Sequence, residues 1–197
     1  MKCSKYEFLE HVKGHHMEIL KDDGLYRHLK FTDGGSQVYR FDLITWPGHL
    51  CICQDMGTYV FSRVADMFDF FYKGKIAINP YYWSEKVQSQ CKQSHIEQYS
   101  QEELIENVWY WFENYFEFKD DEEKEAVKEE INNEVIGSLS GCEIRDYDLV
   151  VDFESSFGHV FLDFFEANNE EYTYHYLWCC WAIVWGIAQY KKSKASN

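Results

Sequence analysis

The sequence predicts an α+β fold, with a four-stranded antiparallel meander over about residues 25–61, a helix before it and a mostly helical, acidic half after it. Three observations predict this fold. Short segments of alternating apolar and polar residues are separated by glycine turns. Helix-capping patterns begin at Ser4 and Ser100. The charge changes sharply near residue 95, so we expect one domain with a near-neutral sheet part at 1–94 and a helical part at 95–197 that is acidic over 95–170.

The first half of the chain carries the sheet. A capping box at Ser4–Glu7 predicts a helix that runs to about Lys21, where Asp22-Asp23-Gly24 ends it. No later connection before residue 61 is long enough for a crossover helix, so the strands are expected to be antiparallel. The predicted strands are Leu25–Phe31, Gln37–Trp46, His49–Gln54 and Thr58–Phe61.

Helices are predicted over most of the remainder. Ser62 is expected to cap one helix, and Pro80 to begin another. The helix after Ser100 is apolar over most of its circumference, whereas the helix over 120–134 has only a narrow apolar stripe. Residues 144–153 fit a strand or a short helix, and residues 157–165 are predicted to be helical. The apolar run at 176–188 is too short to span a bilayer, so we expect a buried helix over 171–190.

Composition limits the possible partners. The net charge is −15, and residues 95–170 alone hold 22 Asp and Glu against four Lys and Arg. Such a chain is repelled by nucleic acid and anionic membranes and attracted to basic surfaces. The seven cysteines are odd in number, irregularly spaced and preceded by no secretory signal pattern, which favours free thiols in a reducing cytoplasm.

Acidic residues on the two central helices form the predicted partner-binding surface. Few lysines accompany them, and crowding of like charges costs stability, which favours a use for the charge. The alternative is a solvated helix face that keeps the protein soluble. The predicted surface consists of Glu102, Glu103, Glu106, Glu113, Glu117, Asp120, Asp121, Glu122, Glu123, Glu129, Glu130 and Glu134.

Two other groups carry residue types used in catalysis. His49, Cys51, Cys53 and Asp55 alternate along one predicted strand and could ligate a metal or supply a thiolate nucleophile. Core packing is the favoured interpretation, because side chains two apart on a flat strand diverge too little to surround a tetrahedral ion. The carboxylates of residues 146–154 could hold a divalent cation, although carboxylates are abundant throughout this segment. No glycine-rich phosphate loop, nucleophile elbow or CxxC pair is present. We therefore predict no catalytic residues, no metal and no cofactor.

Two stretches resemble a family of small uncharacterised proteins of bacteriophages and prophages: RFDLITWPGHLCICQDMGTYVFSR at 40–63 and YHYLWCCWAIVWGIAQY at 174–190. The resemblance implies a phage accessory protein that acts in the cytoplasm of the bacterial host. Such proteins often block host defences, and acidic ones include anti-restriction and anti-CRISPR proteins that occupy nucleic-acid sites on their targets.

The leading hypothesis is a non-enzymatic inhibitor of a bacterial nucleic-acid-handling defence system. Its acidic surface would bind a basic host protein or complex, with a CRISPR-Cas effector as the expected partner, and would bind neither nucleic acid nor membrane. One alternative is a metal-dependent hydrolase or nucleotide-degrading enzyme. Another is a phage structural or host-takeover protein that binds its partner through exposed aromatic side chains.

Overall fold

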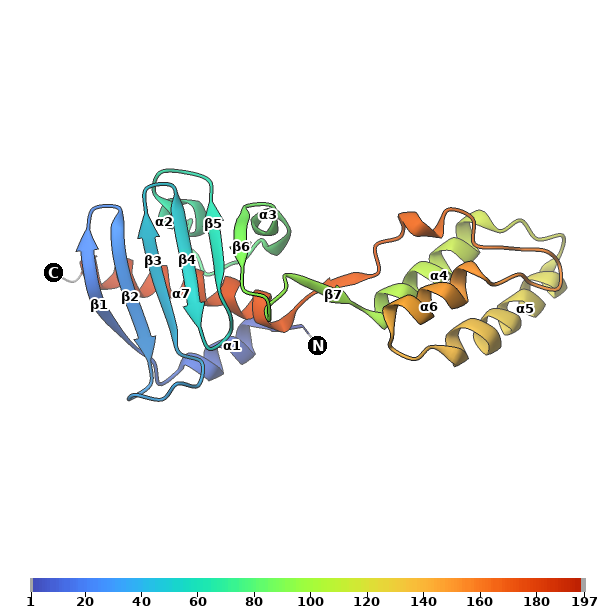
Figure 1. The fold of residues 1–197 in the computed structure, drawn as a ribbon, viewed down its shortest axis with the longest axis horizontal. Helices are drawn as coiled ribbons and strands as arrows, with labels where there is room; N and C mark the ends of the chain where they lie inside the picture. Colours follow the sequence, from blue (N-terminus) through green and yellow to red (C-terminus); the bar gives the residue numbers. More distant parts are fainter. Residues whose placement is uncertain (1, 196–197) are drawn as a thin grey trace. The chain divides into compact units, whose positions relative to one another are not determined.

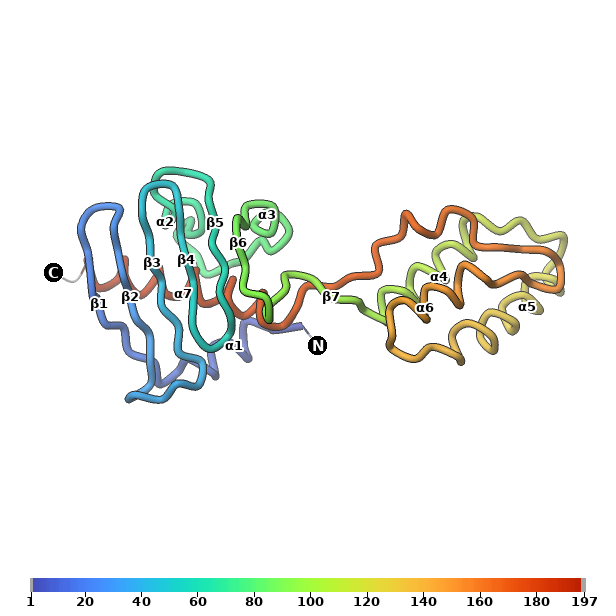
Figure 2. The backbone as a smooth tube through the Cα atoms, in the orientation of Figure 1, coloured from blue at the N-terminus to red at the C-terminus, as the bar shows by residue number. Residues whose placement is uncertain are grey.

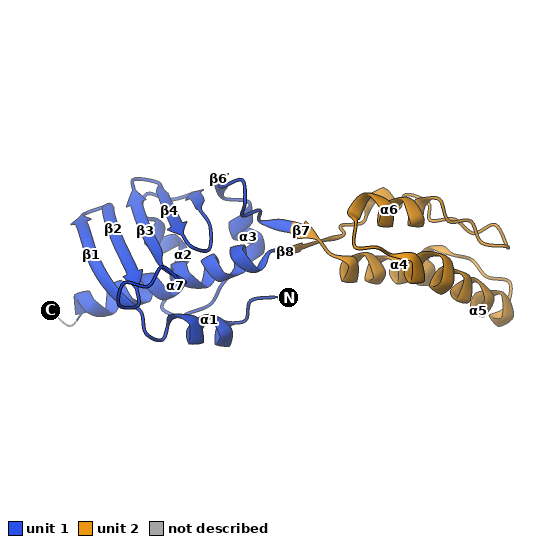
Figure 3. Ribbon diagram, turned by 60° about the horizontal axis from the view of Figure 1, so that its bottom comes forward, with its two compact units in different colours: residues 1–97, 172–197 blue, residues 98–171 orange. Residues whose placement is uncertain are grey.

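The computed structural model describes residues 2–195, and these form two compact units (Figure 3). The first, here called the sheet unit, consists of Met1–Glu97 and Tyr172–Asn197, and the second, the acidic unit, is Gln98–Glu171. The acidic unit is therefore inserted into a unit that is built from both ends of the chain. The predicted division placed all of 95–197 in one helical part, whereas the structure groups the C-terminal helix with the sheet.

The sheet unit contains a six-stranded antiparallel meander, so the prediction of four strands was incomplete. The strands follow one another in sequence order, and every neighbouring pair is antiparallel (Figure 1). The four predicted strands are all present, shifted by one residue or shortened, apart from the third, whose bounds are as predicted. The six strands are β1 (His16–Asp23), β2 (Tyr26–Thr32), β3 (Phe41–Trp46), β4 (His49–Gln54), β5 (Tyr59–Ser62) and β6 (Val87–Gln90).

The prediction of a long first helix was wrong in its second half. Helix α1 begins with the expected capping box at Ser4, but covers only Lys5–Val12. The chain then enters β1, which pairs with β2, and Asp23 lies opposite Tyr26 across a two-residue turn. Gly24 adopts φ +59° there, which is the conformation that a tight hairpin turn requires. Asp23-Gly24 is thus a hairpin signal and not a helix stop.

Helix α7 (Tyr174–Ala195) supplies most of the helical layer on one face of the sheet (Figure 1). Its residues from Tyr176 to Ile187 are mostly buried, which confirms the predicted buried helix. Trp178 packs edge-on against Phe8 of α1, with 5.2 Å between ring centroids, and Trp185 packs against Phe31 of β2 at 5.6 Å. Aromatic side chains therefore join α1 to α7 and α7 to the sheet. Large buried rings contribute much of the burial free energy of such a core.

Two short helices complete the unit: α2 (Met67–Phe71), which contacts α7, and α3 (Pro80–Ser84), which lies beside β6 (Figure 1). Pro80 begins α3 as predicted, but Asp66 and not Ser62 caps α2. Asp66 also forms a bidentate ion pair with Arg27, whose two terminal guanidinium nitrogens lie 2.8 and 2.9 Å from the carboxylate oxygens. The Arg27 guanidinium lies 4.6 Å from the centre of the Phe68 ring, so one half-buried pair links β2 to α2.

The chain enters the acidic unit through strand β7 (Glu97–Tyr99) and leaves it through strand β8 (Glu170–Tyr172), which pair with each other (Figure 2). Between them the unit is helical. Residues 144–153, which fitted either strand or helix, are helical. The helices are α4 (Gln101–Tyr115), α5 (Asp121–Glu130), a π-helical turn η1 (Ile131–Val135), a 3₁₀ turn η2 (Ile136–Ser138), α6 (Glu143–Val151) and a 3₁₀ turn η3 (Phe164–Glu166).

The helix predicted over 157–165 is mostly an irregular segment. The Ser155 hydroxyl accepts hydrogen bonds from the backbone N–H groups of Phe157 and His159, which offers this backbone an alternative to helical bonding. The aromatic residues Phe161 and Phe164 are nevertheless buried. The acidic unit thus has a hydrophobic core of its own, made by one face of α4 together with α5, η1, α6 and this segment.

Candidate partner-binding surface

The negative charge of the chain lies mainly in the acidic unit. The acidic unit holds 22 Asp and Glu against four Lys and Arg, a net charge of −18 over Gln98–Glu171. The rest of the chain holds 12 acidic and 15 basic residues, a net charge of +3. Because the two segments fold as separate units, the negative charge is concentrated on one folded body.

Most of the predicted surface is exposed. Helix α4 buries the face that carries Leu104, Val108 and Phe112, and α5 buries Val127, so their acidic positions face solvent. Nine of the twelve predicted residues are exposed, namely Glu102, Glu106, Glu113, Glu117, Asp120, Asp121, Glu122, Glu129 and Glu134. Two of these nine have local roles within the unit, since Glu113 pairs with Lys124 and Asp120 caps α5.

The other three predicted residues, Glu103, Glu123 and Glu130, are half-buried. The Glu123 side chain is 15% exposed; it accepts a hydrogen bond from the Lys119 backbone N–H, and its second oxygen lies 2.8 Å from His159 Nε2. Glu130 accepts hydrogen bonds from the backbone and hydroxyl of Ser156. Glu123 and Glu130 therefore fasten the 153–160 segment to α5, and they stabilise the unit instead of serving only as surface charge.

An exposed aromatic patch interrupts the carboxylates of α4. We define it as Tyr110, Tyr115 and Leu162, which surround Trp111. The Trp111 indole N–H donates to the Leu162 carbonyl at 2.9 Å, and its ring lies 5.7 Å from Tyr110 and 5.2 Å from Tyr115. Tyr115 is 61% exposed and Leu162 72%. The predicted helix after Ser100 is apolar over most of its circumference, yet the rings of Tyr110 and Tyr115 face solvent.

Tyr110 lies in line with carboxylates. Residues three or four apart share a face of a helix, which places Glu102, Glu106, Tyr110 and Glu113 in one stripe along α4. All four are exposed. The stripe therefore presents negative charge and an aromatic ring to the same side.

Asp146 has a structural role. It is fully buried, and its carboxylate accepts four hydrogen bonds, from the Ser140 N–H and hydroxyl, the Gly141 N–H and the Tyr99 hydroxyl, at 2.7–2.9 Å. Burial raises the pKa of the Asp146 carboxyl, but these hydrogen bonds outweigh burial and hold the pKa below its usual value. This ionised carboxylate fixes the turn that leads into α6.

The neighbouring carboxylates do not join Asp146 in a metal site. Asp148, Asp152 and Glu154 are exposed, whereas Asp146 points into the interior. Across residues 2–195, no three His, Cys, Asp or Glu side chains are placed to hold a metal ion. The structure therefore brings together no ligand set for the hydrolase alternative from these positions.

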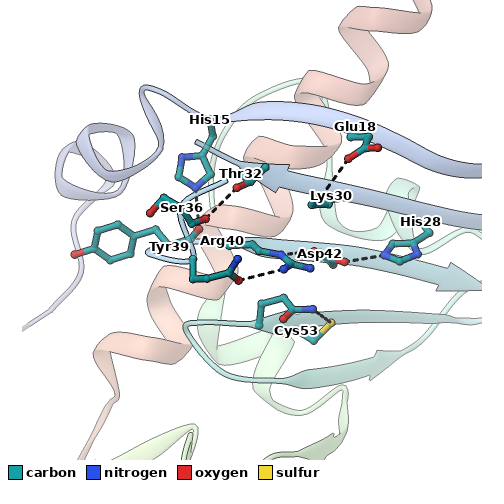
Figure 4. A network of polar contacts seen from close by, with 12 residues as sticks. His15, Glu18, His28, Lys30, Thr32, Ser36, Tyr39, Arg40, Asp42 and Cys53 are labelled. Carbon is teal, nitrogen blue, oxygen red and sulfur yellow. Dashed lines mark hydrogen bonds and ion pairs between the residues drawn. The ribbon is translucent and has the colours of Figure 1, made fainter. Parts of the chain in front are cut away.

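Three residues of the predicted group, His49, Cys51 and Cys53, share one side of β4. They lie opposite Trp46, Ile44 and Asp42 of β3, and of these Asp42 belongs to a polar network (Figure 4). The fourth, Asp55, lies in the following turn and accepts a hydrogen bond from the Tyr39 N–H at 2.7 Å. His49 instead stacks on Trp46, with ring centroids 5.0 Å apart. The hydrogen bond from the Cys51 thiol lowers the pKa of Cys53 and raises that of Cys51.

Asp42 is the centre of this network and was not singled out by the sequence. It is buried, although it lies on the sheet face opposite α7. One carboxylate oxygen lies 2.8 Å from His28 Nε2, and the other lies 3.6 Å from Arg40 Nε (Figure 4). The sequence held a signal for this buried carboxylate, because Asp42 is the one charged residue of strand β3, FDLITW. The network satisfies the buried carboxylate only in part, because Asp42 Oδ1 and Arg40 Nε are buried without a hydrogen-bond partner among the described residues.

No helix in the described part of the chain combines the length and apolarity needed to cross a membrane. No protein-family model, curated protein or solved structure matches this chain. Any function must therefore be argued from the surface of the molecule itself.

Proposed function

We propose that this chain inhibits a bacterial nucleic-acid-handling defence complex, a CRISPR-Cas effector in particular, by occupying the basic surface that otherwise holds DNA or guide RNA. The observation that carries the proposal is the concentration of a net charge of −18 in one separately folded unit. A charge spread only for solubility needs no such segregation. The phage resemblance supplies the setting, a protein that acts against host defences in the bacterial cytoplasm.

The charge density of α5 supports nucleic-acid mimicry. Asp121–Glu130 holds six acidic and two basic residues, a net charge of −4. Ten helical residues extend for about 15 Å, so α5 carries about one net charge per 4 Å. One DNA strand carries a charge every ~3.4 Å. Glu123 and Glu130 are half-buried, so a groove lined with lysine and arginine would meet the exposed acidic residues of α5, namely Asp121, Glu122, Glu125 and Glu129.

The aromatic patch adds a contact that salt does not screen. Tyrosine and tryptophan are enriched among the interface residues that dominate binding energy. Tyr110 and Tyr115 are exposed beside Trp111, and Glu106 and Glu113 flank Tyr110. We therefore expect association to be fast and salt-sensitive, with an apolar contribution that persists at high salt.

The test uses charge reversals that spare the structural carboxylates. Glu122 and Glu129 are exposed and have no ion-pair partner among the described residues, so E122K/E129K changes the charge without removing a contact. Glu123 must be left intact, since E123K would disrupt its contact with His159. The matched control is D23K/D33K, which makes the same charge change at exposed positions of the sheet unit.

The partner is first captured from a host lysate and identified by mass spectrometry, and inhibition of its nucleic-acid binding is then measured. We expect E122K/E129K to weaken inhibition at least about tenfold, whereas D23K/D33K retains it. Circular dichroism and melting curves establish that both variants fold. Equal inhibition by the two folded variants would contradict the role of α5, and a captured partner without a nucleic-acid site would contradict the proposal as a whole.

A further inference from the structure

The sheet unit contains an open cavity whose charge is opposite to that of the whole chain. Its volume is about 630 Å³, and it lies between the end of β5, α2, the 72–79 loop and α3. Three cationic side chains line it, Arg63, Lys73 and Lys75, and no Asp or Glu of residues 2–195 does. This volume falls within the range of ~300–1,000 Å³ that is typical of small-molecule sites.

The cations at this cavity are available to an anion. Arg63 and Lys75 are exposed and have no ion-pair partner within residues 2–195. Among the described residues, the Lys73 ammonium donates to the Asp69 carbonyl alone, which leaves it two further N–H donors. Three neighbouring positive charges without acidic partners repel one another, and a bound anion would relieve that repulsion. The rest of the chain outside the acidic unit holds 12 acidic and 15 basic residues, so a lining with three cations and no carboxylate is a local feature and not the average of the sheet unit.

Aromatic rings form the cavity's other wall. Phe70 and Tyr82 lie with their ring centroids 5.7 Å apart, and Phe71 packs edge-on against Trp83 at 4.8 Å. All four rings line the cavity, and Trp83 and Phe71 are buried beneath it. Each ring is therefore held by a neighbour, and the Lys86 ammonium lies over the Tyr82 ring, 4.6 Å from its centre. A flat ring can stack on such a surface, as bases do on aromatic side chains.

We propose that this cavity binds a nucleoside phosphate, with the phosphates on Arg63, Lys73 and Lys75 and the base against the aromatic wall. Three cations match an anion of more than one charge, which favours a phosphate over a single carboxylate. A free nucleotide fits better than a nucleic acid, because the cavity is limited to about 630 Å³ and the net charge of −15 repels an extended polyanion. The site belongs to the sheet unit and does not depend on the function proposed for the acidic unit.

The test is calorimetric titration of the full-length protein with ATP, AMP, adenosine, pyrophosphate and a single-stranded oligothymidine. We expect ATP and AMP to bind saturably, and adenosine and pyrophosphate to bind at least about tenfold more weakly than ATP, since each offers only one half of the ligand. The variants are R63E and K75E, each of which should weaken ATP binding at least about tenfold. The matched control is K92E, an exposed lysine of the sheet unit outside the cavity, which should bind ATP as the parent does.

Several results would overturn the proposal. One is the absence of saturable binding by both ATP and AMP to the folded protein. A second is an equal loss of ATP binding in K92E, since binding would then be a general charge effect. Pyrophosphate binding as tight as that of ATP would remove the role of the aromatic wall. Tighter binding of the oligothymidine than of ATP would replace a nucleotide site with a nucleic-acid surface. Melting curves confirm that R63E and K75E are folded before each comparison.

Discussion

The buried carboxylate of Asp146 offers the sharpest test of what holds the acidic unit together. D146N keeps the shape of the side chain but replaces one carboxylate oxygen with an NH₂ group. If that group takes the place of Oδ1 it faces the Ser140 N–H, and if it takes the place of Oδ2 it faces the Gly141 N–H. In either orientation a buried backbone donor loses its acceptor, and the negative charge that strengthened the other hydrogen bonds is removed.

The expected cost follows from these contacts. A hydrogen bond to a charged group contributes about 1.5–3 kcal/mol, and an orphaned buried donor costs a similar amount, so D146N should destabilise the acidic unit by about 2–4 kcal/mol. The unit spans the 74 residues of Gln98–Glu171, and small domains have about 0.05–0.15 kcal/mol of stability per residue. The loss is thus a large part of the whole, and the acidic unit should open while the sheet unit does not.

Native-state hydrogen exchange, read by mass spectrometry on peptides of each unit, measures this directly. Protection should fall in peptides from 98–171 and persist in peptides of the sheet unit. D148N is the matched control, because Asp148 is exposed on the same helix. A change below about 0.5 kcal/mol in D146N, or an equal change in D148N, would refute the structural role assigned to the buried carboxylate.

The same comparison has a defined pH dependence. The pKa of Asp146 lies below its usual value in the folded unit, so its ionised form contributes stability above the unfolded pKa of about 3.9. This contribution is lost as the pH falls through the lower, folded-state pKa. The stability difference between the parent and D146N in urea unfolding should therefore be constant near neutral pH and shrink in acid. A difference that grows in acid would contradict the sign of the shift.

Two further predictions concern the sheet unit. G57A should lower the free energy of unfolding by at least about 2 kcal/mol, because Gly57 has φ +107° and an added Cβ would lie 2.3 Å from Ser94 Oγ. The control is G48A, at φ +81° with open space around it, which should show only the smaller cost of backbone strain. Urea unfolding measures both costs, and equal costs would exclude the Ser94 contact. D66A should lower the free energy of unfolding by about 2–4 kcal/mol in the same measurement, since it removes the partner of Arg27 and the cap of α2. The Arg27 ion pair lowers the pKa of Asp66, so this stabilisation is present at neutral pH and disappears as the pH falls through the folded-state pKa. A cost of D66A that does not change with pH would contradict the role of the ion pair.

Local sequence patterns predicted most of the strands of the sheet and helix α7. The strands from residue 26 to residue 62 alternate and end at glycine turns, and α7 is marked by its continuous apolar run. Strand β1 was missed because His16–Asp23 has no regular alternation and most of its residues are exposed. Its pairing with β2 decides its structure, and that information lies outside the segment.

The residues of the acidic surface were predicted, but the role of each residue was not. Composition alone reveals a segment of net charge −18, and helical spacing suggests which residues face outward. Composition does not reveal that Glu123 and Glu130 hold the 153–160 segment, because the partner residues lie 26–36 positions away in the sequence. The cavity of the sheet unit was missed for the same reason, since Arg63 and Lys75 are brought together only by the path of the 63–83 segment.

The most direct test of the central claim is a competition titration, in which the captured effector complex holds a labelled DNA duplex and fluorescence anisotropy follows its displacement by this chain. We predict that the parent protein displaces the DNA, that D23K/D33K does so equally, and that E122K/E129K requires at least about tenfold more protein. Raising the salt should weaken displacement, because screening reduces the attraction between the acidic unit and the basic groove. Simultaneous binding of the DNA and the parent protein to the effector would contradict the account.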